Sequence, residues 1–221
     1  MDGNRQTSRT FTSGVAVAGL FLFVVAGGCK DELPLQGPPQ VPGMAAGERV
    51  YFFDDFQNGV PLWEPMAGNW DLSQQGSATE YVPVRGGYSL SYAGSPNWSN
   101  YRVNAKVVID DDRQGQVGIV GRGDGSHYYY ELLLGRNPQG QKSWTIRQRI
   151  SHQWVTLATG PFEYTLGTPY VLQLSFDGLK MEGAISRDGG GSFDKLGVAE
   201  AAQGSWQIGR ASCRERVCLV V

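Results

Sequence analysis

The chain has 221 residues, of which 31 are glycine, 11% are aromatic and only 18% are charged. This composition favours a turn-rich all-β protein over a helical one. The formal net charge is −2 and there is no basic tract, so nucleic acid is not an expected partner.

The first 28 residues have the character of an export signal. Two arginines precede an apolar run, residues 15–26, that is too short to cross a bilayer comfortably. Small residues then lead to Cys29 in a pattern that resembles the lipobox of bacterial lipoproteins, although Ala26 replaces the usual leucine. The resemblance implies cleavage before Cys29 and a lipid on its thiol, which anchors the chain to a membrane without spanning it. An ordinary secretory signal and a short membrane anchor are the alternatives.

Residues 29–48 are predicted to be a tether. Their prolines and glycines disfavour helix and sheet and favour an extended, semi-rigid chain. Such a segment would hold the following domain away from the bilayer. Lys30 and Asp31 give no clear signal for retention at an inner membrane. We therefore expect an exported protein, lipid-anchored in the cell envelope, at the outer membrane if the cell is Gram-negative.

Short β-prone runs separated by turn signals fill residues 49–207. The expected strands are 50–56, 81–84, 88–92, 101–109, 117–122, 128–134, 144–150, 154–158, 170–176 and 181–186. No stretch after Cys29 keeps a helical period over a dozen residues. Strands at this spacing predict an all-β fold, a two-sheet antiparallel β-sandwich of the jelly-roll type.

Residues 115–134 carry the clearest pattern. Two β-prone runs flank the Gly/Asp/Ser cluster at 123–126, which predicts a hairpin turn. Successive side chains of a strand point to opposite faces, so Tyr129 and Glu131 are expected to face away from the core. Arg122 is expected on the same outer face. If that face is only solvated sheet surface, Arg122 and Glu131 would form a cross-strand ion pair.

The last residues, 208–221, differ from the rest. Glycine-rich β sequence gives way to alternating arginine, cysteine and glutamate, and residues 208–217 resemble one reading frame of a common sequencing adapter. We therefore predict a non-native, adapter-derived tail. A zinc site or a disulfide formed by Cys213 and Cys218 is the alternative, although a second ligand pair is missing. Residues 49–207 contain no cysteine, so their stability depends on the core.

Several short motifs follow one another between residues 50 and 206. They are Phe53-Asp54-Asp55-Phe56, Trp63, Gly68-Asn69-Trp70-Asp71, Trp98-Ser99-Asn100-Tyr101, Gly118-Ile119-Val120-Gly121-Arg122 and Tyr129-Tyr130. In this order they resemble the concanavalin A-like lectin and glucanase superfamily, with its laminin G-like members among the most similar. The resemblance implies a closing strand beside the first one, which is expected to be missing where the tail begins. It also implies a structural calcium near Asp54 and Asp55, which would need further oxygen ligands; a charged strand end is the alternative.

Catalytic motifs are not found. Family 16 glycoside hydrolases on this fold carry Glu-x-Asp-x-x-Glu, in which one carboxylate attacks the sugar and another protonates the leaving oxygen. This chain has no such triplet, and Glu131 stands without a second acid at strand spacing. A nucleophile elbow, a phosphate loop and a histidine-rich metal motif are also missing from the sequence. Binding is therefore favoured over catalysis, with a glycoside-processing enzyme that uses Glu131 as the alternative.

Polar residues at outward positions on consecutive strands form the candidate carbohydrate site. They are Asn104, Arg122, Tyr129, Glu131, Arg147 and Gln173. Sugars are bound by planar, multi-donor side chains beside an aromatic platform, which Trp98, Trp144 or Trp154 would supply. We predict a membrane-tethered, lectin-like domain that binds a glycan and needs no cofactor beyond a structural calcium. A solvated sheet face and a protein-interaction module are the alternatives.

Residues 186–193 match the Asp-box pattern Ser-x-Asp-x-Gly-x-Ser-Phe. This motif resembles β-hairpin turns of sialidases and other sugar-handling β proteins. Asp188 is expected to accept hydrogen bonds from turn amides, and Phe193 is expected to pack inward. A single copy does not indicate a propeller, which would repeat the motif.

Overall fold

The computed structural model describes residues 23–26, 48, 50–75, 78–84, 87–94, 98, 100–113, 115–123, 128–201 and 216–220. Residues 23–26, 51, 75, 78 and 216–220 are described by their backbone alone. Every regular element in these ranges is a β-strand. Among these residues, no helix has the length and hydropathy that crossing a bilayer requires.

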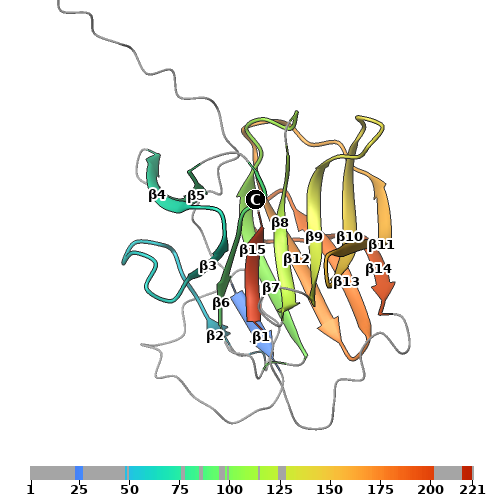
Figure 1. The fold of residues 1–221 in the computed structure, drawn as a ribbon, viewed down its shortest axis with the longest axis horizontal. Coiled ribbons are helices and arrows are strands. Elements are labelled where there is room, and N and C mark those ends of the chain that lie inside the picture. The colour runs from blue at the N-terminus through green and yellow to red at the C-terminus, as the bar shows by residue number, and fades with distance from the viewer. Residues whose placement is uncertain are drawn as a thin grey trace, which may run out of the picture.

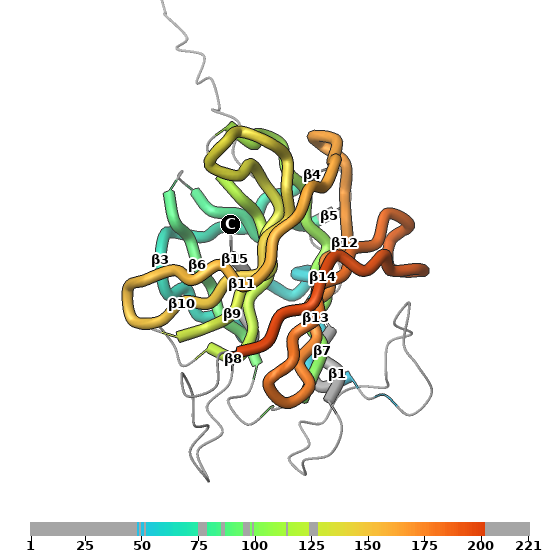
Figure 2. The backbone as a smooth tube through the Cα atoms, turned by 90° about the vertical axis from the view of Figure 1, so that its right-hand side faces the viewer, coloured from blue at the N-terminus to red at the C-terminus, as the bar shows by residue number. Residues whose placement is uncertain are grey.

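Two large antiparallel sheets form the two layers of the molecule (Figures 1 and 2). The six-stranded sheet has the order β14 (Asp194–Glu200), β13 (Lys180–Ser186), β12 (Pro169–Asp177), β7 (Tyr101–Val108), β1 (Phe23–Ala26) and β2 (Val50–Phe52). The seven-stranded sheet has the order β11 (Gln153–Pro161), β10 (Lys142–Ile150), β9 (Tyr128–Arg136), β8 (Gln116–Gly123), β15 (Arg216–Val220), β6 (Leu90–Ala93) and β3 (Glu64–Ala67). A separate hairpin joins β4 (Trp70–Gln75) to β5 (Ala78–Pro83). The predicted all-β sandwich is confirmed.

The main core lies between the two large sheets. Val103 and Leu172 from one layer meet Leu132 and Ile146 from the other, and all four side chains are fully buried. Alternation along β9 divides its residues between two clusters, as the sequence predicts. Tyr130, Leu132 and Leu134 join the main core, whereas Tyr129 and Leu133 join a smaller cluster on the outer face of the seven-stranded sheet. This smaller cluster also contains Leu90, Tyr92 and Val120.

Two strands come from segments predicted to lie outside the sandwich. The backbone of β1 pairs with β7 and β2, and that of β15 pairs with β8 and β6. β15 thus occupies an interior position of the seven-stranded sheet. The processing of residues 1–28 and the non-native origin of residues 208–221 are not settled by strand pairing and stay predictions. Cys29, Cys213, the tether up to residue 47 and the turn at 124–127 lie outside the described residues.

The Asp-box turn after β13 has the predicted hydrogen bonds. Ser186 Oγ donates to Asp188 Oδ1 at 2.5 Å and accepts the Gly190 N–H at 2.8 Å. The Asp188 carboxylate also accepts the N–H and the hydroxyl of Ser192, at 3.0 and 2.7 Å. These bonds, with that from Ser186 the strongest, hold the pKa of Asp188 well below its usual range. Phe193 is half-buried and contributes only a partly covered ring. The motif therefore has a structural role in this turn.

Candidate functional site

The residues predicted for the carbohydrate site lie on different sheets. Asn104 on β7 and Gln173 on β12 are paired neighbours in the six-stranded sheet, and both are buried. Tyr129 and Glu131 lie on β9 and Arg147 lies on β10, in the seven-stranded sheet. Since the outer surfaces of two packed layers face opposite directions, these residues do not share one surface. The expectation of a single six-residue face is wrong in this respect.

Arg122 also leaves the predicted face. Its φ of 53° is in the left-handed region, which breaks the alternation at the end of β8. Its backbone N–H donates to the Tyr101 hydroxyl at 2.5 Å, and its guanidinium lies 4.8 Å from the ring centroid of Phe176 and donates to the Gly178 carbonyl. These three partners belong to the opposite layer. The Arg122–Glu131 ion pair that belonged to the alternative of a solvated sheet face is not formed, and Val120 is the β8 residue that pairs with Glu131.

The register of β9, β10 and β11 arranges the outer face in rows. Tyr129, Arg149 and Trp154 lie directly opposite one another, as do Glu131, Arg147 and Thr156 in the next row. Leu133, Thr145 and Thr159 form a third row, in which the two threonine hydroxyls are 3.2 Å apart. Cross-strand neighbours of this kind share a face of the sheet. We call Tyr88, Tyr129, Glu131, Arg147, Arg149 and Trp154 the outer-face cluster.

Two aromatic side chains of the outer-face cluster are accessible. Trp154 is 37% exposed and Tyr88 is 41% exposed, whereas Trp98 and Trp144 are buried in the core. The ring centroids of Trp154 and Tyr129 are 5.6 Å apart and those of Trp154 and Tyr88 are 6.2 Å apart, both edge to face. Of the three tryptophans proposed as a platform, Trp154 alone is placed where a ligand has access.

Both arginines of the cluster lie against these rings. The guanidinium of Arg147 is 3.8 Å from the centroid of Trp154, and that of Arg149 is 5.1 Å from the same centroid. Arg149 also donates through Nη1 to the Tyr129 hydroxyl at 2.8 Å and through Nε to the Ser151 carbonyl at 3.3 Å. Aromatic contacts hold a guanidinium in one orientation at a low cost in side-chain entropy. The cluster therefore presents fixed donors beside exposed rings.

Glu131 lies fully buried beneath these side chains. Arg147 Nε donates to Glu131 Oε2, and the Tyr88 hydroxyl approaches Oε1 at 3.5 Å. Burial raises the pKa of Glu131 to about 7, although the charge and hydrogen bond of Arg147 oppose the rise. A general acid must reach the leaving oxygen of its substrate, and a fully covered carboxyl does not. The geometry gives Glu131 the role of orienting Arg147.

Sequence patterns indicated part of this cluster. Outward alternation on residues 144–150 applies to Arg149 as well as to Arg147. Tyr88 carried no such signal, because it comes from the segment before β6 and meets Tyr129 only through the tertiary fold. The two tyrosine hydroxyls form a hydrogen bond.

Asp54 and Asp55 take part in a turn after β2. Asp54 accepts the Phe56 N–H at 2.7 Å and the indole N–H of Trp63 at 2.8 Å, and Asp55 accepts the Gln57 N–H at 3.1 Å. Among the described side chains, no group of three or more His, Cys, Asp or Glu residues is suited to hold a metal ion. The carboxylate of Asp54 thus fixes Trp63 against the core, and the calcium stays a prediction.

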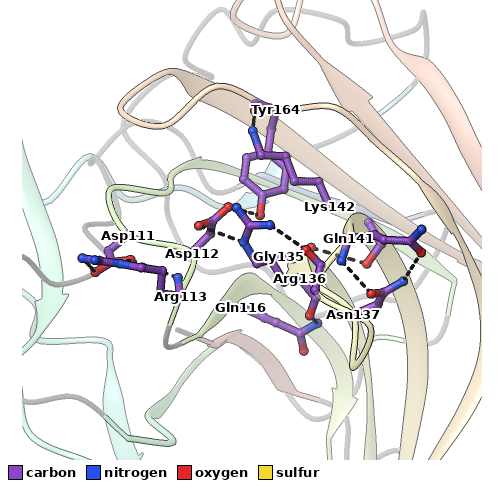
Figure 3. A network of polar contacts seen from close by, with 12 residues as sticks. Asp111, Asp112, Arg113, Gln116, Gly135, Arg136, Asn137, Gln141, Lys142 and Tyr164 are labelled. Atoms are coloured by element: carbon purple, nitrogen blue, oxygen red, sulfur yellow. Dashed lines mark hydrogen bonds and ion pairs between the residues drawn. The ribbon is translucent and has the colours of Figure 1, made fainter.

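A second polar network lies among the β7–β8, β9–β10 and β11–β12 connections (Figure 3). Asp112 is buried, with only 4% of its surface exposed. It accepts a hydrogen bond from the Tyr164 hydroxyl at 2.9 Å and pairs with Arg136 Nε at 3.1 Å. Lys142 Nζ donates to the Tyr164 carbonyl at 2.6 Å. These bonds connect the three loops with one another, and they leave Asp112 inaccessible to ligands.

The comparisons with known proteins concern the fold. No protein-family model and no curated protein sequence matches the chain. A GH43_12 protein retrieved from capybara gut metagenome is 14% identical, with a TM-score of 0.55, and the match covers 80% of this chain and 36% of that one. The enzymatically active domain of tailspike protein 2 from bacteriophage CBA120 is 9% identical, with a TM-score of 0.51, covering 72% and 25%. The carbohydrate-binding module CBM66 from Bacillus subtilis is 11% identical, with a TM-score of 0.48, covering 72% and 87%. At these identities the likeness to the first two structures shows the fold alone.

Proposed function

We propose that this chain binds carbohydrate on the outer face of β9, β10 and β11. The observation that carries the proposal is the exposed ring of Trp154, 37% accessible, beside Arg147 held in place by Glu131. Apolar faces of sugar rings pack on aromatic side chains, and sugar hydroxyls take hydrogen bonds from planar, multi-donor groups. The hydroxyls of Thr145 and Thr159 extend the polar surface along the same face.

The fold is consistent with this proposal. The GH43_12 neighbour, with a TM-score of 0.55, is a glycoside hydrolase, and its similarity to this chain covers 36% of its length. A β-sandwich of this shape thus occurs within a protein that acts on glycans. Because a fold hosts many functions, the outer-face cluster and not the fold is the basis of the assignment.

Binding is expected to depend on Trp154. Trp154→Ala removes the accessible ring, and truncating an aromatic residue at the centre of a binding surface weakens binding about 30-fold or more. A glycan array identifies the ligand, and calorimetry then measures the dissociation constant. Leu179→Ala is the matched control, because Leu179 is similarly exposed, at 40%, but lies in the turn between β12 and β13. Equal affinity of both variants and the unaltered chain would contradict the site. Capture of a protein on this face, with no glycan bound, would favour a protein-interaction module.

We further propose that the domain is a lipid-anchored, concanavalin A-like lectin of the cell envelope. The support comes from the lipobox-like sequence before Cys29 and from the ordered motifs between residues 50 and 206. Radiolabelled palmitate is expected to enter the chain expressed in a bacterium and to be lost in Cys29→Ser. Labelling that persists in this variant would refute the anchor.

A further inference from the structure

We infer that the carbohydrate bound by the outer-face cluster carries carboxylate groups, as uronic acids do, and that Arg149 binds them. This inference rests on the proposed function and adds the chemical class of the ligand. The charges of the three strands that make the face support it. β9, β10 and β11 contain four basic residues, Arg136, Lys142, Arg147 and Arg149, and one acidic residue, Glu131. The three strands together therefore carry an excess of positive charge.

Two of the four cations lie away from the face. Arg136 pairs with Asp112, and Lys142 donates to the Tyr164 carbonyl, in the network of Figure 3. The remaining two, Arg147 and Arg149, stand beside Trp154. Glu131 is the counter-ion of Arg147. Arg149 has no carboxylate partner within the described ranges, because its acceptors there are the neutral Tyr129 hydroxyl and the Ser151 carbonyl.

Arg149 is also equipped to bind an anion. A guanidinium has five N–H donors, and the contacts of Arg149 with the Tyr129 hydroxyl, the Ser151 carbonyl and the Tyr88 hydroxyl use at most three of them. At least two donors remain on a group that is fixed by rings at 5.1, 5.5 and 5.6 Å, those of Trp154, Tyr88 and Tyr129. Guanidinium binds carboxylate through paired, charge-assisted hydrogen bonds, which neutral sugars do not offer. A uronate whose ring packs near Trp154 would supply the missing negative charge.

Protonation of Glu131 also makes the charge of the face more positive. Around neutral pH this buried carboxyl is only partly ionised, because burial raises its pKa to about 7. The groups that face it are Arg147 and Arg149 from β10, Tyr129 from β9 and Tyr88 from the segment before β6. Mildly acidic conditions therefore increase the positive charge of the face.

The test uses an array of polygalacturonate, alginate and hyaluronan, each also offered as its methyl ester, with neutral dextran, xylan and levan beside them. We expect at least one acidic polymer to bind about tenfold more tightly than its own ester, since esterification removes the negative charge and leaves the sugar ring and its hydroxyls unchanged. The difference should shrink as ionic strength rises. It should vanish in Arg149→Met and be only partly kept in Arg149→Lys, which retains the charge but not the paired donors. Arg187→Met is the matched control, because Arg187 also lies over a ring, that of Phe162 at 4.7 Å, but belongs to the Asp-box turn.

The outcomes separate the two levels of the proposal. One outcome is that an acid and its ester bind equally, or that only neutral polymers bind, and that this binding is lost in Trp154→Ala. It would refute the proposal of an acidic ligand but support the carbohydrate site. Binding to no member of the array counts against the site itself and therefore against both. A tenfold preference that survives in Arg149→Met, shown by thermal melting to be folded, would remove Arg149 from the assignment.

Discussion

Replacing Arg147 by methionine is expected to lower the free energy of unfolding by about 3–5 kcal/mol near pH 8. This is the usual cost of removing one partner of a buried ion pair, because the other charge stays buried without compensation. Glu131 is fully buried and receives its charged hydrogen bond from Arg147 Nε. Urea denaturation followed by tryptophan fluorescence measures the change.

The pH dependence of this effect identifies its cause. The pKa of Glu131 in the folded chain, about 7, is above the ordinary value of 4.5. The folded state thus holds the proton more tightly than the unfolded state, so the contribution of Glu131 to stability is complete below about pH 4.5 and is lost as the pH rises through 7. Without Arg147 the pKa rises further. The Arg147→Met variant should therefore lose much less stability at about pH 5 than at about pH 8.

Two further variants serve as controls for the buried pair. Arg149→Met makes the same change on the same strand, but the hydrogen-bond acceptors of Arg149 are neutral, and Glu131 keeps Arg147, whose charge acts on it more strongly; a loss of about 1 kcal/mol is expected. The double variant Glu131→Gln, Arg147→Met should recover part of the stability at about pH 8, because it removes the uncompensated carboxylate. Equal losses in Arg147→Met and Arg149→Met at every pH would contradict a buried pair.

Asp112→Ala is expected to destabilise the chain by about 2–3 kcal/mol at neutral pH. The change leaves the buried hydroxyl of Tyr164 without its acceptor at 2.9 Å and removes the counter-ion of Arg136 at 3.1 Å. Burial by itself raises the pKa of Asp112, but the hydrogen bonds from Tyr164 and Arg136 outweigh it and hold the pKa below its usual range. Chemical denaturation of both chains at several pH values measures the difference.

The contribution of Asp112 to stability changes with pH in the opposite direction to that of Glu131. A lowered pKa means that the stabilisation is present above the unfolded value of 3.8 and is lost as the pH falls below it. The difference between the unaltered chain and Asp112→Ala should therefore shrink toward about pH 3. Asp111→Ala is the control, because its partner Arg113 has an 80% exposed side chain; the effect should be much smaller. An equal effect of the two substitutions would show that the network in Figure 3 does not stabilise the fold.

Features that depend only on neighbouring residues of one strand or turn could be predicted from the sequence. Alternation along β9 predicts that Tyr130 and Leu132 face the core and that Tyr129 and Glu131 face outward, as the structure shows. The Asp-box residues 186–193 likewise contain both the donors and the acceptors of their own turn. A two-residue period and a short-range hydrogen bond depend only on neighbouring residues, so both are readable along the chain.

Which strands lie side by side could not be predicted in this way, because it depends on the whole fold. In the folded chain Asn104 and Gln173 lie in the opposite layer, and the positive φ of Arg122 points its side chain away from the predicted face. Glu131 forms its ion pair with Arg147, 16 residues further along. Tyr88 reaches Tyr129 across 41 residues. Alternation tells which side of a strand a residue occupies but not which strand lies beside it, since that choice is made by the packing of the whole core.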